Sequence, residues 1–156
     1  MRLPLFNPSW SLSVKHQHFI VAALAAVFSL PALAAPAGVM LKDPYCGCCD
    51  AWAGHMKQNG LEVTSRIEQN MAKIKDERRV PANLRSCHTA EIGGYLFEGH
   101  VPADLVKKVL KDKPKIAGLA VPGMPMGSPG MEGPSKQAYQ VVAFDRQGKT
   151  YVYANR

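Results

Sequence analysis

The first 34 residues contain no acidic side chain and no apolar run long enough to cross a membrane. Two basic residues precede an apolar segment of 12 residues, 19–30, whereas a membrane-spanning helix needs roughly 18 or more. A short apolar core followed by an Ala-x-Ala pattern that ends at Ala34 is typical of a secretory signal peptide. We therefore predict that 1–34 is a signal peptide and that 35–156 is an exported, periplasmic chain without a membrane span.

The remaining sequence lacks internal repeats, a domain linker and any aromatic or glycine-rich module that binds nucleic acid. The whole chain has 19 basic and 12 acidic residues, and removal of 1–34 leaves 17 basic residues and a net charge of +5. The lysines that cluster on and after one predicted helix are typical of a solvated face, and they are Lys107, Lys108, Lys111, Lys113 and Lys115. We therefore expect a single domain over 35–156 and no nucleic-acid partner.

Cysteine is scarce, and three of the four cysteines lie within four positions, at Cys46, Cys48 and Cys49. Four cysteines in an exported protein usually form two disulfides. Cys48 and Cys49 are adjacent and do not pair easily, so the two bridges would join Cys46 to Cys49 and Cys48 to the distant Cys87. Both bridges are possible, but two disulfides at a single turn would be unusual, which favours another use for the sulfur.

The pattern around the cysteines predicts a strand over 39–42, a helix over 50–57 closed by Gly60, and a strand with one buried face over 61–67. Such a unit implies two parallel strands joined by a right-handed crossover. The cysteines would lie at a strand-to-helix turn, where free N–H groups and the helix dipole favour thiolate, and Asp50 would cap the helix.

The remaining periodic segments predict a short surface helix, a β-hairpin, a longer helix and a C-terminal β-hairpin, over 69–79, 87–98, 102–112 and 139–153. The stretch 118–131 is rich in glycine and proline, which argues against a helix or a central strand there. The order β-α-β, β-hairpin, helix predicts an α/β fold of the thioredoxin-like class. In that class a C-x-x-C pair follows the first strand, as Cys46 and Cys49 do, and a cis-proline faces it, for which Pro81 is the nearest candidate.

Three uses of the clustered sulfur compete. A structural zinc site needs two well-separated pairs of thiolates, whereas the grouping here is three plus one. A thiol–disulfide oxidoreductase would use Cys46 as nucleophile and Cys49 as resolving thiol, but it would leave Cys48 and Cys87 in excess. Thiolate and thioether sulfur select Cu(I), and a bridging thiolate lets a compact group hold several copper ions. The residues favour copper over disulfide exchange.

Three further side chains are candidate copper ligands beside the four cysteines. His88 follows Cys87 and offers an imidazole, while Met124 and Met131 lie on the glycine- and proline-rich stretch and offer thioethers. Packing is the competing use, because neighbours on a strand point to opposite faces and methionine fills gaps in a core. The predicted metal set is Cys46, Cys48, Cys49, Cys87, His88, Met124 and Met131.

Five longer motifs carry a family resemblance, and they are Tyr45-Cys46-Gly47-Cys48-Cys49, Ser86-Cys87-His88-Thr89-Ala90, Glu98-Gly99-His100-Val101-Pro102-Ala103, Val121-Pro122-Gly123-Met124-Pro125 and Gly127-Ser128-Pro129-Gly130-Met131-Glu132. Over about 38–154 the chain resembles the exported family, long described only as a domain of unknown function, that includes the bacterial copper-resistance protein CopG. The resemblance implies a thioredoxin-like fold that holds a multinuclear copper cluster, bridged by the four cysteines.

These observations predict a periplasmic copper-binding protein that acts in copper resistance by sequestration, by exchange or by Cu(I)/Cu(II) conversion. Its expected partners are copper ions and other periplasmic copper-handling proteins. The chain would be primarily a metal-binding protein, with copper oxidoreductase activity left open. The alternative is a periplasmic thiol–disulfide oxidoreductase that uses Cys46 and Cys49.

Overall fold

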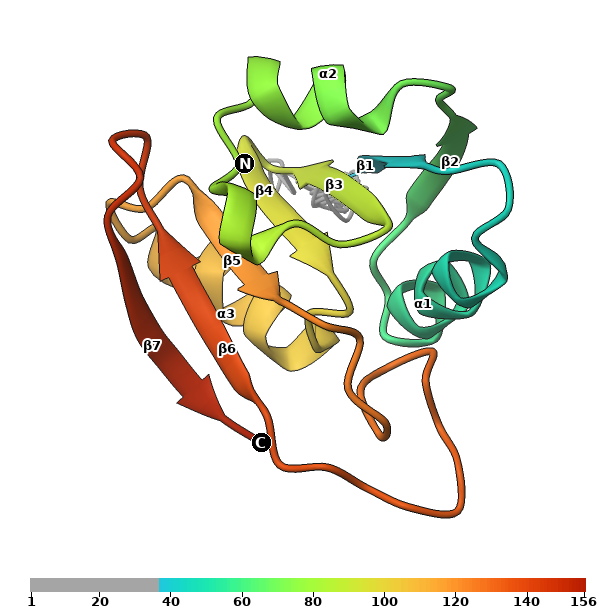
Figure 1. Ribbon diagram of the computed structural model, residues 1–156. Helices are drawn as coiled ribbons and strands as arrows, with labels where there is room; N and C mark the ends of the chain where they lie inside the picture. Colours follow the sequence, from blue (N-terminus) through green and yellow to red (C-terminus); the bar gives the residue numbers. More distant parts are fainter. Residues whose placement is uncertain (1–36) are drawn as a thin grey trace, which may run out of the picture. The chain divides into compact units, whose positions relative to one another are not determined.

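The computed structural model describes residues 37–156, and the predicted signal peptide, 1–34, lies outside the described residues (Figure 1). Within 37–156 the chain has a mixed α/β fold with one seven-stranded sheet and three α-helices. No helix in this part of the chain is long and apolar enough to cross a membrane.

The elements follow in chain order as β1 (Gly38–Lys42), α1 (Gly47–Gln58), β2 (Val63–Ile67), α2 (Met71–Glu77), the 3-10 helix η1 (Ala82–Leu84), β3 (His88–Ile92), β4 (Tyr95–Gly99), α3 (Ala103–Asp112), β5 (Gly118–Val121), β6 (Gln140–Phe144) and β7 (Thr150–Asn155). In space the strands are ordered β2-β1-β3-β4-β5-β6-β7. The pairs β1–β2 and β4–β5 are parallel and the other neighbours are antiparallel. The predicted β-α-β unit and both predicted hairpins are present.

Helices cover both faces of the sheet. On one face α1 and α3 bury Trp52 and Val106 in the main core, where each large apolar side chain contributes roughly 1.5–3 kcal/mol. On the other face η1 contributes Leu84 to a smaller core, and α2 sends Lys75 to the hydroxyl of Thr89 on β3. Since alternate residues of β3 point to alternate faces, neighbours in this strand meet quite different surroundings.

The prediction that 118–131 holds no central strand is wrong. Its first four residues form β5, which lies between β4 and β6 and is buried along its whole length. Gly118 fits there because a Cβ atom at this position would overlap the carbonyl group of Leu96 on β4. The first proline of the stretch is Pro122, so the backbone N–H groups of β5 stay available to the sheet.

Two smaller expectations also fail. The strand β2 lies at the edge of the sheet and leaves most of its side chains exposed, with Ile67 60% exposed, so its alternating pattern does not mark a buried face. Pro81 precedes η1, and its peptide bond is trans, like every other peptide bond among residues 37–156. It is therefore not the cis-proline expected of the thioredoxin-like class.

Candidate metal centre

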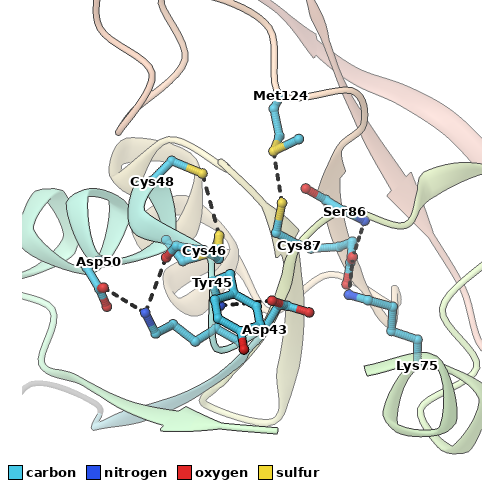
Figure 2. Close-up of a disulfide and its surroundings, with 12 residues drawn as sticks. Asp43, Tyr45, Cys46, Cys48, Asp50, Lys75, Ser86, Cys87 and Met124 are labelled. Carbon is cyan, nitrogen blue, oxygen red and sulfur yellow. Dashed lines mark hydrogen bonds and ion pairs between the residues drawn. A yellow bond between two sulfur atoms is a disulfide. The ribbon is translucent and has the colours of Figure 1, made fainter. Parts of the chain in front are cut away.

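Four cysteines meet where β1 ends and α1 begins. Figure 2 labels three of them, Cys46, Cys48 and Cys87. Their four Sγ atoms all lie within 4.8 Å of one another. The antiparallel pairing of β1 with β3 sets Lys42 opposite His88, and this register carries Cys87 to the start of α1. The structure therefore brings together all four of the cysteines in the predicted metal set.

The helix α1 begins three residues before its predicted start, at Gly47. Cys46 occupies the N-cap position, and Cys48 and Cys49 lie within the first turn. Asp50 is therefore inside the helix and does not cap it. Glycine and cysteine have low helix propensity, which hides this first turn in the sequence.

The four sulfur atoms are in two chemical states. Cys46 and Cys49 form a disulfide, while Cys48 and Cys87 are free thiols. The Sγ atom of Cys48 lies 3.5 Å from that of Cys46. Reduction of the disulfide by two electrons and two protons would give four thiols in one place.

Met124 also reaches this group. Met124 lies in the segment that follows β5, and its thioether accepts a hydrogen bond of 3.0 Å from the Cys87 thiol (Figure 2). Met131 lies further along that segment, partly buried, with its backbone hydrogen-bonded to Gly127 and Ser128. Close by, a Cβ atom on Gly130 would come within 2.8 Å of the backbone nitrogen of Trp52, so the segment packs directly on α1.

His88 lies on the other side of its strand from the residues that flank it, against two aromatic rings. Its ring centroid is 4.6 Å from that of Trp52 and 5.5 Å from that of His100. Both imidazoles are fully buried, and within residues 37–156 their ring nitrogens make no hydrogen bond of good geometry, although the backbone of Gly99 lies near enough to His88, and that of Pro129 to His100, to oppose the lowering of their pKa values. Burial, aided by His100, lowers the pKa of His88 to about 3, so the ring is neutral. His88 does not belong to the group of four sulfur atoms.

A buried ion pair on the opposite face is tied to the segment that carries Cys87. The Lys75 ammonium donates to the Glu98 carboxylate and, at 2.8 Å, to the Thr89 hydroxyl. Lys75 bonds to Oε1 of Glu98, and the backbone N–H of Ser86 donates to the same oxygen. The Thr89 hydroxyl donates to Oε2 of Glu98 at 2.6 Å. Burial raises the pKa of Glu98 and lowers that of Lys75, while each charge opposes the shift of the other.

Lys42, at the end of β1, forms a second buried contact with the site. Its ammonium donates to the Cys46 carbonyl oxygen at 3.2 Å and to Asp50 at 2.7 Å. These contacts fasten the strand to the first turn of α1. Sequence reasoning missed both Lys42 and the Lys75–Glu98 pair, because a lysine that will be buried looks like any surface lysine until its partner is known.

Cys87 differs from the three cysteines of the strand-to-helix turn, for which the sequence predicts thiolate. Burial is the largest effect and raises the pKa of the Cys87 thiol, and the neighbouring Cys48 adds to the increase. Ser86 and Lys75 lower the pKa of Cys87 but do not cancel this increase. A metal that binds this sulfur must therefore displace a proton.

The donor set is soft. Four cysteine sulfurs and one thioether lie together, and no imidazole or carboxylate belongs to the group of four. Such donors suit Cu(I), which accepts thiolate and thioether ligands.

Comparison with known proteins gives a consistent picture. The family model described as "Protein of unknown function, DUF411" matches residues 84–131. No curated protein sequence matches the chain significantly. Two solved structures of the copper resistance protein CopG, forms 1 and 2, are each 43% identical to this chain with a TM-score of 0.74; the match covers 78% of this chain and 98% of the CopG chain. At this identity and coverage, the chain belongs to the same family as the copper resistance protein CopG.

Proposed function

We propose that this chain is a periplasmic copper-binding protein that holds several Cu(I) ions in a cluster bridged by Cys46, Cys48, Cys49 and Cys87, and that it acts in copper resistance. The observation that carries the proposal is the convergence of four cysteine sulfurs within 4.8 Å of one another. Kinship with the copper resistance protein CopG supports it.

Each cysteine would act as a thiolate. A thiolate sulfur can bind more than one Cu(I) ion, so four bridging sulfurs in a small volume favour a cluster over a single ion. The Met124 thioether, 3.0 Å from Cys87, is the best placed additional donor. His88 and Met131 stay predicted ligands, His88 because its neutral imidazole packs against Trp52 of α1 and its nitrogens make no hydrogen bond of good geometry.

Cys46 and Cys49 bind copper in this proposal only after their disulfide has been reduced. A cuprous cluster then forms by loss of one proton from each thiol, with no change in the copper oxidation state. Conversion between Cu(I) and Cu(II) is a further part of the proposal, and in it each ion would give one electron to, or take one from, an external redox partner. Storage or exchange of Cu(I) requires no such step.

The proposal includes export of 35–156 after removal of 1–34, and a thioredoxin-like core formed by β1, β2, β3 and β4. The strand order β2-β1-β3-β4 and the C-x-x-C pair that follows β1 support this core. The trans bond at Pro81 is a difference from that class.

The decisive experiment counts copper. The 35–156 chain is reduced with a phosphine under anaerobic conditions, loaded with Cu(I), separated from free metal and measured by elemental analysis. We expect more than one copper ion per chain, and a large loss of bound copper in Cys87→Ser. Binding of one ion or none by the fully reduced protein would contradict the cluster.

A second candidate function rests on the disulfide itself. Cys46 and Cys49 are already joined, and the Cys48 sulfur is 3.5 Å from Cys46, which suits exchange between thiols and disulfides. A thiol–disulfide oxidoreductase would reduce insulin without copper and would tolerate Cys48→Ser. The copper protein would lose bound copper in the same variant.

A further inference from the structure

A cavity of about 240 Å³ opens beside the four cysteines. Cys46 and Cys87 form part of its wall, and its other lining residues are Asp43, Tyr45, Met71 and Ser86. Tyr45 is 94% exposed, so the cavity opens to solvent. Two of the four predicted copper-binding cysteines therefore line a space that a hydrated or chelated ion can enter.

The side of the cysteines away from the cavity is partly covered by the segment after β5. Met124 contacts Cys87 from the segment after β5, and Figure 2 shows it on the side of Cys87 away from Tyr45 and Asp43. Gly130 of the same segment packs against the first turn of α1, where a Cβ atom would come within 2.9 Å of the Cys48 carbonyl oxygen. Cys49 is completely buried. Cys48 is half-buried and does not line the cavity, so the cavity is the approach that leads to Cys46 and Cys87.

Met71 gives the cavity a soft ligand of its own. This residue begins α2 and is partly exposed, and it supplies the one thioether among the residues that line the cavity. From sequence alone Met71 is a packing residue on a surface helix. In the structure it borders the same space as Cys46 and Cys87.

We propose that the Met71 thioether is an entry ligand, which takes Cu(I) from its carrier in the cavity and passes it to Cys87 and Cys46. This inference rests on the proposed copper function and adds the route by which the metal arrives. The step is a ligand exchange. A carrier ligand leaves copper as the Met71 sulfur binds, thiolate sulfurs then replace Met71, and each thiol that binds releases one proton to water. Copper remains Cu(I) throughout.

The test separates the rate of loading from the amount of copper loaded. Fully reduced protein is mixed under anaerobic conditions with the coloured cuprous bicinchoninate complex, and loss of colour is followed by stopped flow. We expect Met71→Leu to load roughly tenfold more slowly, because its side chain fills the same space without a soft donor. The number of copper ions bound at equilibrium is expected to equal that of the wild type.

Two variants control for a structural effect. Met126→Leu changes another partly buried methionine that lies outside the cavity lining, and it should load at the wild-type rate. Met71→His supplies an imidazole that also binds copper, and it should load faster than Met71→Leu. A general loss of packing at position 71 would slow both Met71 variants equally.

Each outcome decides. Loading of Met71→Leu at the wild-type rate overturns the entry role, and so does a lower copper count, which would make Met71 a permanent ligand. Equal slowing of Met71→Leu and Met71→His also overturns it. If the wild-type protein takes up no Cu(I), the proposed function fails. If the wild-type protein loads fully but at the same rate as Met71→Leu, only the entry role of Met71 fails.

Discussion

The chain neighbours of Cys87 lead into two buried polar clusters that are built differently. The backbone of Ser86 joins the Lys75–Glu98 pair, in which the charged atoms bond to each other, to Thr89 and to the main chain. His88 stacks on His100, and within 37–156 neither ring has a hydrogen-bond partner. The first cluster is closed, whereas the second retains free donor and acceptor atoms.

The two clusters therefore suit different roles: the first positions the main chain, and the second could bind a ligand. A closed network of charges holds the main chain before Cys87 in one position, because any shift would break several charged hydrogen bonds in a low-dielectric environment. The neutral imidazoles form no such network, so they do not hold the main chain in this way. Each buried ring nitrogen without a partner also costs free energy. Burial lowers the pKa of His88 to about 3, so its ring nitrogens are better suited to bind a metal ion than a proton.

The largest expected effect comes from opening the closed cluster. Glu98→Ala leaves the Lys75 ammonium buried without its partner, and breaking a buried pair in this way costs about 3–5 kcal/mol. Urea unfolding of the metal-free protein measures the loss. The double variant Lys75→Met with Glu98→Leu should recover most of it, because two apolar side chains of similar size leave no unpaired charge.

Asp112→Ala is the matched control for that experiment, since Asp112 pairs with Lys108 on the exposed face of α3. It should change the unfolding midpoint far less than Glu98→Ala. Equal effects of the two variants would show that the closed cluster is no more important than a surface ion pair.

A smaller effect is expected from acid acting on the open cluster. Burial lowers the pKa of His88 to about 3 from 6.5, so between these values the unfolded chain binds a proton that the folded chain does not. Stability therefore falls as the pH falls below 6.5, with a slope of up to about 1.4 kcal/mol per pH unit from this residue. Thermal unfolding of metal-free wild type and His88→Phe at several pH values isolates the contribution, and identical slopes would contradict it.

The smallest effect on stability is expected at neutral pH. His88→Phe keeps an aromatic ring against Trp52 and removes two unpaired nitrogens, so the free energy of unfolding should change by no more than about 1 kcal/mol. If His88 is a copper ligand, His88→Phe should bind copper more weakly than the wild type. Competition with a cuprous chelator measures this affinity. His100→Phe, which removes the neighbouring ring nitrogens, is the control, and equal affinities in wild type and His88→Phe would refute the ligand role.

Local sequence patterns predicted much of the fold. The β-α-β unit, the hairpin at Gly93-Gly94 and the helix after Pro102 depend on short-range periodicity and turn residues, and all three are present. The pattern failed for β5, whose glycine and small residues suit a strand only because β4 and β6 lie on both sides of it.

The candidate site was also predicted only in part, because some of its residues come together only in the folded chain. Clustering in the sequence revealed Cys46, Cys48 and Cys49, and both the soft-metal interpretation and the family resemblance joined Cys87 to them. The Lys75–Glu98 pair spans 23 residues and gives no local signal. Met71 belongs to the cavity only through the position of α2 beside the cysteines.

The origin of the four sulfurs also links metal binding to folding. Three come from one short segment that stays together in an unfolded chain, whereas Cys87 arrives only when β3 pairs with β1. An unfolded chain therefore keeps a three-thiol chelator, and copper bound there lessens the stabilisation that the metal gives to the native state. In the proposed cluster the fourth sulfur would supply the preference of copper for the folded protein, so the melting temperature should rise with bound copper mainly when Cys87 is present.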